Sequence, residues 1–180
     1  EVEESGHGIV PTSSTINQMS VGDALAIALM EKRKFSKFDF KKFHPSGNLG
    51  NKLKTASDLM QTKNKIPFIN ENQTMKEALK VINQKRLGFL VIVNNQGYTR
   101  GVFTDGDLKR LMHKKEKIGK SKIKAFMSKN PFCIEESTLA SEVLSQMNKK
   151  KITNVCVYNK DNKHKTIGVL HIHDLLNNLR

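Results

Sequence analysis

Two residues of the stretch GVFTDGD, residues 101–107, carry side chains suited to holding a nucleotide. The hydroxyl of Thr104 can bind a phosphate beside the unpaired backbone N–H groups at the start of a helix. The carboxylate of Asp107 can accept hydrogen bonds from two ribose hydroxyls. Thr and Asp are also favoured helix caps, whether or not a ligand binds. The sequence therefore leaves ligand binding and helix capping open for both residues.

A looser copy of this stretch, GVLHIHDLLNNL, lies at residues 168–179. Asp174 matches Asp107, but His171 stands where the first copy has Thr104. Because the hydroxyl is missing, we expect Asp174 to act mainly as a helix cap. The sequence thus predicts a second site whose ligand chemistry is lost or altered.

The second copy also contains His171 and His173, which would point the same way on a strand. A metal site needs further ligands, and only Asp174 next door and His164 in an expected loop are near in sequence. We therefore expect these histidines to form the polar rim of a cleft, and we expect no metal and no cofactor.

The spacing of matched residues indicates that a whole structural unit is repeated. Two matched pairs are 67 residues apart and two are 64 apart. These pairs are Met60 and Met127, Gly101 and Gly168, Thr74 and Thr138, and Val93 and Val157. Compensating insertions of three residues in loops would explain both spacings, as structural repeats tolerate.

Each repeat predicts the order β-α-β-β-α. In repeat one, Thr74 and Glu77 form a capping-box pattern before a run with helical periodicity. Repeat two keeps Thr138 but has Ser141 at the acidic position, so we expect a weaker cap there. Dense apolar strands, FLVIV and NVCVY, follow the helices, and each repeat ends with a strand that begins at the glycine and a short helix.

With these motifs, residues 57–113 and 124–180 resemble a tandem pair of cystathionine-β-synthase (CBS) domains. The family motif is Gly, two apolar residues, Thr or Ser, two residues and Asp, which GVFTDGD fits fully and GVLHIHD fits without the Thr. The resemblance implies two sheets packed together with two clefts, which in many members bind adenine or other nucleotides. It places Thr104, Asp107 and Asp174 at these clefts, with Thr74 as a further candidate.

The first fifty residues follow a different pattern. Apolar residues surround the middle of an expected helix at 21–30, so this helix needs a large partner surface. The segment is too short to supply that surface. We therefore expect it to be the end of a larger α/β domain, and the first residue, Glu1 rather than Met, suggests a fragment.

Three motifs in this segment, PTSST at 11–15, GDALA at 22–26 and HPSGNLG at 44–50, resemble the D-arabinose-5-phosphate isomerase family. The resemblance implies that residues 1–53 are the C-terminal part of a doubly wound sugar-isomerase (SIS) domain. It implies interconversion of D-ribulose 5-phosphate and D-arabinose 5-phosphate for Kdo and lipopolysaccharide synthesis. It also implies a homotetramer, and a regulatory ligand such as CMP-Kdo at a CBS cleft.

The family's catalytic histidine falls on His44, and one catalytic carboxylate falls on Glu3 or Glu4. Histidine titrates near neutral pH, as removal of the proton beside the carbonyl requires. Ser13, Ser14 and Thr15 at the helix start could hold the substrate phosphate or act as ordinary caps. The family's phosphate loop, a Lys and another Glu would lie upstream, so we expect no turnover from these residues alone.

Charge and composition bear on nucleic-acid binding, membrane insertion and the state of the cysteines. The net charge is +14, and half of it lies in residues 109–124. This run lacks aromatic residues for base stacking, so we expect a solvated linker and no nucleic-acid partner. No apolar run could span a membrane, and we expect a cytoplasmic protein with Cys133 and Cys156 as reduced core thiols. The alternative function is a stand-alone CBS module that senses a nucleotide or sugar nucleotide.

Overall fold

A computed structural model describes residues 10–43, 47–112 and 118–179. The chain divides into two compact units, Glu1–Gly47 and Asn48–Arg180. The second unit contains both sheets and all the clefts described below. Within the described residues, no helix is long and apolar enough to cross a membrane.

The first unit is built from helices. Helix α1 spans Ser13–Lys32 and α2 spans Lys37–Phe43. No described residue of α1 is buried, and its exposed side chains include seven large apolar ones. These are Ile16, Met19, Val21, Leu25, Ile27, Leu29 and Met30. The long helix expected around 21–30 is confirmed, and its apolar side chains are not buried by the described residues.

A local cap fixes the start of α2. The backbone N–H and hydroxyl of Ser36 both donate to the carboxylate of Asp39, at 3.0 and 2.7 Å. These bonds, with help from Lys42, lower the pKa of Asp39 to about 2 because they stabilise the ionised carboxylate. The Phe35 and Phe43 rings stack across the helix with their centroids 6.2 Å apart.

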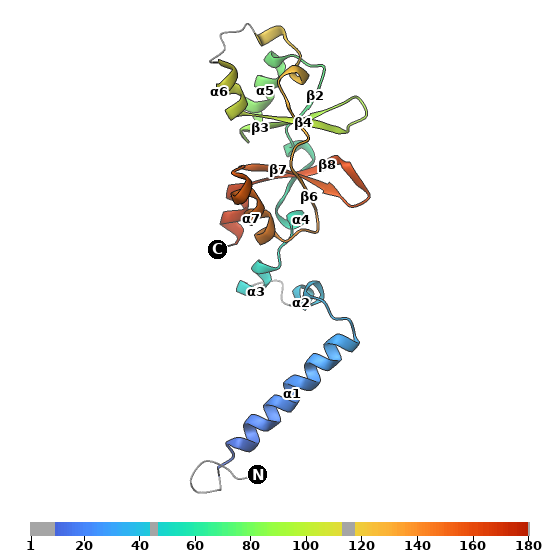
Figure 1. Cartoon of the computed structure of the whole chain (residues 1–180), viewed down its shortest axis with the longest axis vertical. Coiled ribbons are helices and arrows are strands. Elements are labelled where there is room, and N and C mark those ends of the chain that lie inside the picture. The colour runs from blue at the N-terminus through green and yellow to red at the C-terminus, as the bar shows by residue number, and fades with distance from the viewer. Residues whose placement is uncertain (1–9, 44–46, 113–117, 180) are drawn as a thin grey trace. The chain divides into compact units, whose positions relative to one another are not determined.

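The second unit contains two β-α-β-β-α repeats, as the sequence predicted (Figure 1). Helices α3 (Gly47–Lys52) and α4 (Ala56–Leu59) lead into it. The first repeat comprises β1 Gln61–Thr62, η1 Lys63–Lys65, β2 Phe68–Asn70, α5 Met75–Lys85, β3 Phe89–Val93, β4 Thr99–Thr104 and α6 Asp105–Met112. The second comprises η2 Ile118–Lys120, η3 Ile123–Ala125, β5 Ser128–Lys129, β6 Cys133–Glu135, α7 Ala140–Lys150, β7 Asn154–Asn159, β8 Asn162–His171 and α8 Ile172–Asn178.

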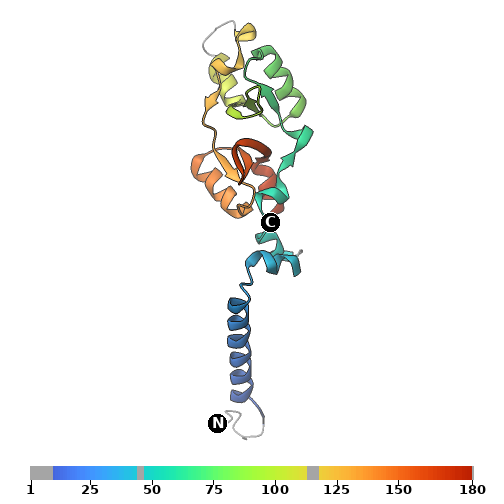
Figure 2. The same cartoon turned by 90° about the vertical axis from the view of Figure 1, so that its right-hand side faces the viewer.

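The repeats exchange their first strands. One sheet has the order β2-β3-β4-β5 and the other β1-β8-β7-β6, so β1 joins the sheet of repeat two and β5 joins that of repeat one. In Figure 2 the two crossing segments pass between the halves on opposite sides. Ala56, which precedes β1, is buried in the core of repeat two, and Ile123, which precedes β5, is buried in that of repeat one. Neither repeat can therefore complete its core without the other.

The layers are helices, sheet, sheet, helices (Figure 1). Each sheet packs its outer face on its own helices, around Phe103 in repeat one and Leu170 in repeat two. A third apolar cluster joins the inner faces, with Phe89 and Val91 from one sheet and Cys156 and Val169 from the other. Burial of these fully enclosed side chains is the main force holding the repeats together.

Strand register corrects the expected spacing in the middle of the repeats. Leu90 pairs with Phe103, and Val155 pairs with Leu170, so Leu90 and Val155 are equivalent positions 65 residues apart, not 64. The loops therefore differ by two residues, not three. The expected match of Val93 with Val157 was wrong by one residue, and a slip of one residue would exchange the two faces of a strand.

The helix caps show the same one-residue difference. Thr74 caps α5 and forms the predicted capping box with Glu77, whose pKa is lowered by hydrogen bonds from the backbone and hydroxyl of Thr74. The equivalent N-cap of α7 is Leu139, not Thr138, and it makes no side-chain capping bond. The weaker cap expected in repeat two is confirmed, but its cause is the apolar residue at the cap position.

Candidate functional site

A cleft of about 650 Å³ opens where β4 ends and α6 begins. Repeat one contributes Gly88, Phe89 and the run from Thr104 to Asp107. Repeat two contributes the crossing segment Ser128–Phe132 and the run Lys151–Asn154. This first cleft has the size of a small-molecule site and lies between the repeats.

Thr104 and Asp107 form a reciprocal helix cap at the mouth of the first cleft. The backbone N–H and hydroxyl of Thr104 donate to Asp107 Oδ2, at 2.9 and 2.8 Å, and the Asp107 N–H donates back to the hydroxyl at 3.2 Å. The capping role left open by the sequence is therefore realised. It also preorganises both groups, because the cap fixes the rotamers of the hydroxyl and the carboxylate.

Arg110 adds a cation that the sequence analysis did not single out. Its Nη2 lies 2.5 Å from Asp107 Oδ1, and its side chain is 72% exposed while that of Asp107 is 14% exposed. Asp107 and Arg110 are three residues apart on the same helix, a spacing at which opposite charges commonly pair. This spacing could have predicted the ion pair from the sequence. The cleft therefore combines a hydroxyl, a carboxylate and an exposed guanidinium, which suits a ligand with a ribose and a phosphate.

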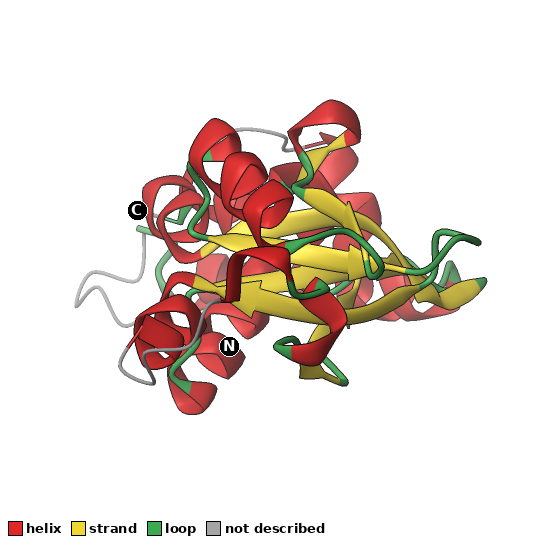
Figure 3. Cartoon of the chain, turned by 90° about the horizontal axis from the view of Figure 1, so that it is seen from above, coloured by secondary structure: helices red, strands yellow, loops and turns green. Residues whose placement is uncertain are grey.

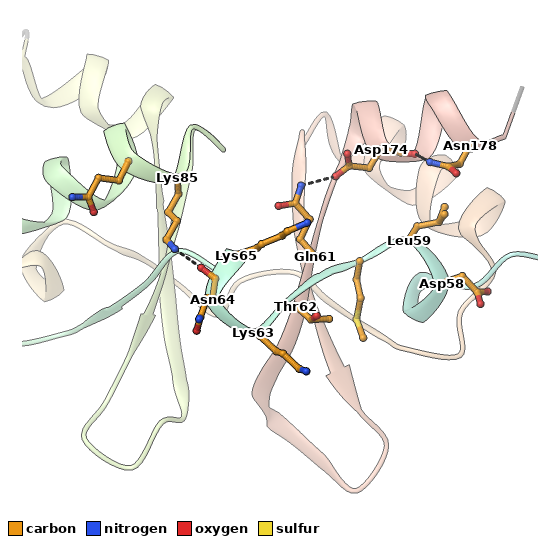
Figure 4. A pocket seen from close by; sticks show the side chains of 12 residues that line it. Asp58, Leu59, Gln61, Thr62, Lys63, Asn64, Lys65, Lys85, Asp174 and Asn178 are labelled. Atoms are coloured by element: carbon orange, nitrogen blue, oxygen red, sulfur yellow. Dashed lines mark hydrogen bonds between the residues drawn. The ribbon is translucent and has the colours of Figure 1, made fainter.

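A second cleft of about 930 Å³ surrounds Asp174 (Figure 4). Its wall is the crossing segment Gln61–Lys65, together with Lys85 and Asn178. Gln61 Nε2 donates to Asp174 Oδ2 at 3.2 Å, and Lys85 Nζ donates to the Asn64 carbonyl. Asp174 is thus tied to the crossing strand, and this cleft offers lysines where the first offers a threonine hydroxyl.

His171 takes the place of Thr104 as a helix cap. It is the last residue of β8 and the N-cap of α8, and its Nδ1 accepts the His173 N–H at 3.2 Å. Asp174 Oδ2 accepts the His171 N–H at 3.4 Å, so the capping role expected for Asp174 is observed. Burial is the main cause that lowers the pKa of His171, the nearby His173 adds to it, and Asp174 opposes it.

The expectation that His171 and His173 share a strand was wrong, because the strand ends at His171 and His173 lies in α8. Their rings stay close, with centroids 4.9 Å apart. His171 lines the first cleft together with Thr104, as a polar rim residue should. Among the described residues, no group of three or more His, Cys, Asp or Glu side chains is placed to hold a metal ion.

The other candidate residues that the structure describes lie at the starts of helices α5 and α1. Thr74 caps α5 and does not line either cleft. Ser13, Ser14 and Thr15 form the first turn of α1 after the N-cap Thr12, and the Thr15 hydroxyl donates to the Pro11 carbonyl at 3.3 Å. His44, Glu3 and Glu4 lie outside the described residues.

The two cysteines lie opposite each other on neighbouring parallel strands, β6 and β7. Both thiols are free. Cys156 is fully buried and donates to Cys133, which raises the pKa of Cys156 well above its ordinary value and lowers that of Cys133. Donation to the thiolate of Cys133 favours its ionised form, whereas burial disfavours the ionised form of Cys156.

The two repeats match a known domain family, and nearly the whole chain aligns with curated proteins. The CBS domain family model matches residues 56–114 and 123–180. Arabinose 5-phosphate isomerase KdsD of Salmonella typhi is 39% identical over 170 residues, which cover 94% of this chain and 51% of that protein. The chain thus spans about half the length of the curated relatives it matches.

Solved structures share the fold of the second unit. The structure of CBSX2 in complex with AMP superposes with a TM-score of 0.57 at 21% identity, covering 68% of this chain and 93% of that one. The CBS domain of a bacterial CNNM/CorC family Mg2+ transporter in complex with ATP gives a TM-score of 0.61 at 16% identity, covering 73% and 90%. At these identities the likeness shows the fold alone.

Proposed function

Because this chain belongs to the CBS domain family, we propose that its paired repeats, residues 57–113 and 124–180, bind a nucleotide in the first cleft. The observation that carries the proposal is the set of Thr104, Asp107 and Arg110 at one helix start, in a cleft of about 650 Å³ between the repeats. Asp107 would release its cap in part to accept the ribose hydroxyls, and Arg110 would turn to the phosphate. The AMP and ATP complexes of proteins with this fold support the ligand class.

The second cleft serves as the internal control. Asp174 is held by Gln61 and His171, and no hydroxyl stands at the position of Thr104. We therefore expect one nucleotide per chain. CMP-Kdo, the regulatory ligand that the family resemblance implies, carries the same ribose and phosphate groups and is our candidate regulator.

Calorimetric titration of the chain with AMP, ATP and CMP tests the proposal. Asp107→Asn keeps the size of the side chain but removes the charge that accepts both ribose hydroxyls, and Asp174→Asn makes the same change in the second cleft. We expect Asp107→Asn to weaken binding about tenfold or more, as loss of a charge-assisted bond does, and Asp174→Asn to leave it unchanged. Equal effects of the two variants, or no nucleotide binding, would refute the assignment.

We also propose that the chain is the C-terminal part of an arabinose 5-phosphate isomerase, with residues 1–53 completing a SIS domain. The relatives named KdsD support this, since they align over 94% of the chain. The seven exposed apolar side chains of α1 support it too. A large exposed apolar surface usually packs against a partner, and an isolated sensor module would leave it exposed to water. This observation favours the isomerase over the stand-alone CBS module.

In this proposal His44 removes a proton from C1 of D-ribulose 5-phosphate, beside the C2 carbonyl, to give an enediol, and the proton then returns to C2 as the aldehyde forms at C1. Glu3 is the partner carboxylate. Ser13, Ser14 and Thr15, at the start of α1, would hold the substrate phosphate. The conversion of D-ribulose 5-phosphate to D-arabinose 5-phosphate should be absent with the 180-residue chain. In the intact protein, His44→Ala should lower kcat about 10²- to 10⁴-fold, as loss of a general base does, while His173→Ala should not.

A further inference from the structure

A third pocket, of about 540 Å³, opens at the start of β4 and borders the first cleft, with which it shares Lys129, Asn130 and Pro131. Arg100 of β4, Lys129 of β5, and Lys163 and His164 of β8 line it, and no Asp or Glu does. We propose that this pocket, the hairpin pocket, binds a small polyanion of the phosphate class, such as a pyrophosphate or another multiply phosphorylated metabolite.

The basic residues of the hairpin pocket come from both repeats. The β3–β4 and β7–β8 hairpins project from the same side of the module (Figures 1 and 3). Their strands meet at Thr99 and Thr166, whose hydroxyls lie 2.7 Å apart. The crossing strand β5 pairs Lys129 with Gly101, which places a lysine beside Arg100. An anion here would therefore join three strands from two repeats.

The positive charge in the hairpin pocket is poorly compensated. Glu71 Oε2 lies 4.0 Å from Arg100 Nε, at the outer limit of an ion pair, and Arg100 is 57% exposed. Such a pair neutralises little charge. Within the described residues, Lys129 and Lys163 have no ion-pair partner. Like charges held together by the fold are stabilised by an anion that contacts all of them.

The internal repeat shows that this charge is not a general feature of a lysine-rich chain. Equivalent residues of the two sheets are 67 apart in this region, as Thr99 and Thr166 are. By this spacing, Arg100 corresponds to Ile167 and Lys129 to Thr62. Arg100 and Lys129 are thus replaced by neutral residues on the other side of the module.

Binding of inorganic pyrophosphate to the chain tests this inference, at constant ionic strength and by calorimetry. The triple variant Arg100→Gln, Lys129→Gln, Lys163→Gln removes three charges from the hairpin pocket. Its matched control, Lys76→Gln, Lys80→Gln, Lys149→Gln, removes three charges from exposed faces of α5 and α7. We expect saturable binding, weakened about tenfold or more by the first triple variant and unchanged in the control.

Two further measurements locate the anion. Cys133 also lines the hairpin pocket, so pyrophosphate should slow its alkylation in the wild type and not in the first triple variant. Asp107→Asn should leave pyrophosphate binding intact, because Asp107 lines the first cleft and not the hairpin pocket. The inference does not depend on the proposed nucleotide site. Thermal denaturation of each variant confirms that it is folded.

Several results would overturn the inference. Absence of saturable binding would do so, as would equal weakening by both triple variants, which indicates diffuse attraction. Loss of pyrophosphate binding in Asp107→Asn with retention in the first triple variant would place the anion in the first cleft. Binding of a duplex DNA oligonucleotide through the same three residues, without pyrophosphate binding, would identify a nucleic-acid surface instead.

Discussion

The hydroxyls of Thr99 and Thr166, equivalent residues 67 positions apart, are bonded to each other at 2.7 Å. Thr166 is buried, and its N–H also donates to the Thr99 hydroxyl at 3.1 Å. A contact between two equivalent residues must lie on the axis that relates the repeats. The axis that relates the two repeats therefore passes through this hydrogen bond. The bond joins the two sheets in addition to the apolar cluster between their inner faces.

Replacing Thr166 by Val should lower the free energy of unfolding by about 1 kcal/mol, because a buried hydrogen bond is lost while the volume is kept. Thr99→Val should have a similar effect. Since both changes remove the same bond, the double variant should cost less than the sum of the two. Urea denaturation of the four proteins measures this coupling. Strictly additive losses would show that the two hydroxyls do not interact.

The two motif glycines should not tolerate a methyl group. A Cβ on Gly101 would lie 2.7 Å from the Ser128 carbonyl oxygen and 2.9 Å from Met127 Sδ, and a Cβ on Gly168 would collide with Met60. Each glycine thus lets the crossing segment of the other repeat lie against the strand. We expect Gly101→Ala and Gly168→Ala to destabilise by about 1–3 kcal/mol, as overpacking does.

Gly119→Ala is the control for this prediction, because a Cβ there meets no atom within 4 Å. The three atoms nearest to a Cβ at Gly168 all belong to the Met60 side chain, whereas the nearest atom at Gly101 is a backbone oxygen. Met60→Ala should therefore relieve part of the cost of Gly168→Ala, and Met127→Ala should relieve less of the cost of Gly101→Ala. Wild-type stability in both glycine variants would argue against the packing described.

His171 should make stability depend on pH. Its pKa is lowered in the folded chain, whereas in the unfolded chain it stays near the ordinary value of about 6.5. The unfolded state therefore takes up the proton first, and stability should fall as pH drops below about 6.5 toward the folded pKa. Protonation also removes the Nδ1 lone pair that caps α8.

His171→Thr restores the cap of the first repeat and removes the titrating group, so its stability should change less over the same pH range. Urea midpoints measured on both sides of about pH 6.5 test this. His164→Thr, at an exposed position near the start of β8, is the matched histidine control. An unchanged pH dependence in His171→Thr would show that another group is responsible.

Alkylation should distinguish the two cysteines. Cys133 is partly exposed and its pKa is lowered by the hydrogen bond from Cys156, while the pKa of the buried Cys156 is raised. Because the thiolate is the reactive form, iodoacetamide should modify Cys133 first and Cys156 only on unfolding. Mass spectrometry after brief treatment gives the order, and modification of Cys156 in the folded Cys133→Ser variant would contradict it.

Local patterns predicted the elements of the second unit well. The capping box at Thr74 and the strands FLVIV and NVCVY are local features, and each is present where expected. The cap at Leu139 was missed because Thr138, one residue earlier, is of a type that commonly caps helices. Side-chain preference identifies a cap to within a residue, and only the register of the strands fixes it.

The exchange of first strands could not be inferred from local patterns. A segment of two paired residues such as β1 or β5 carries no sign of which sheet it joins. The same is true of the clefts, whose second walls are these crossing segments. The constant spacing of Met60 to Met127 and Gly101 to Gly168 did contain a signal, because each methionine packs on the glycine of the other repeat.

Amide hydrogen exchange with and without ATP tests the central claim most directly. If the nucleotide binds in the first cleft, protection should increase at Asp105–Asp107 and in the crossing segment Ser128–Phe132. Gln61–Lys65 and Asp174, which line the second cleft, should exchange as before. Protection confined to the second cleft, or spread equally over both, would contradict the assignment of Thr104 and Asp107 as the nucleotide-binding residues.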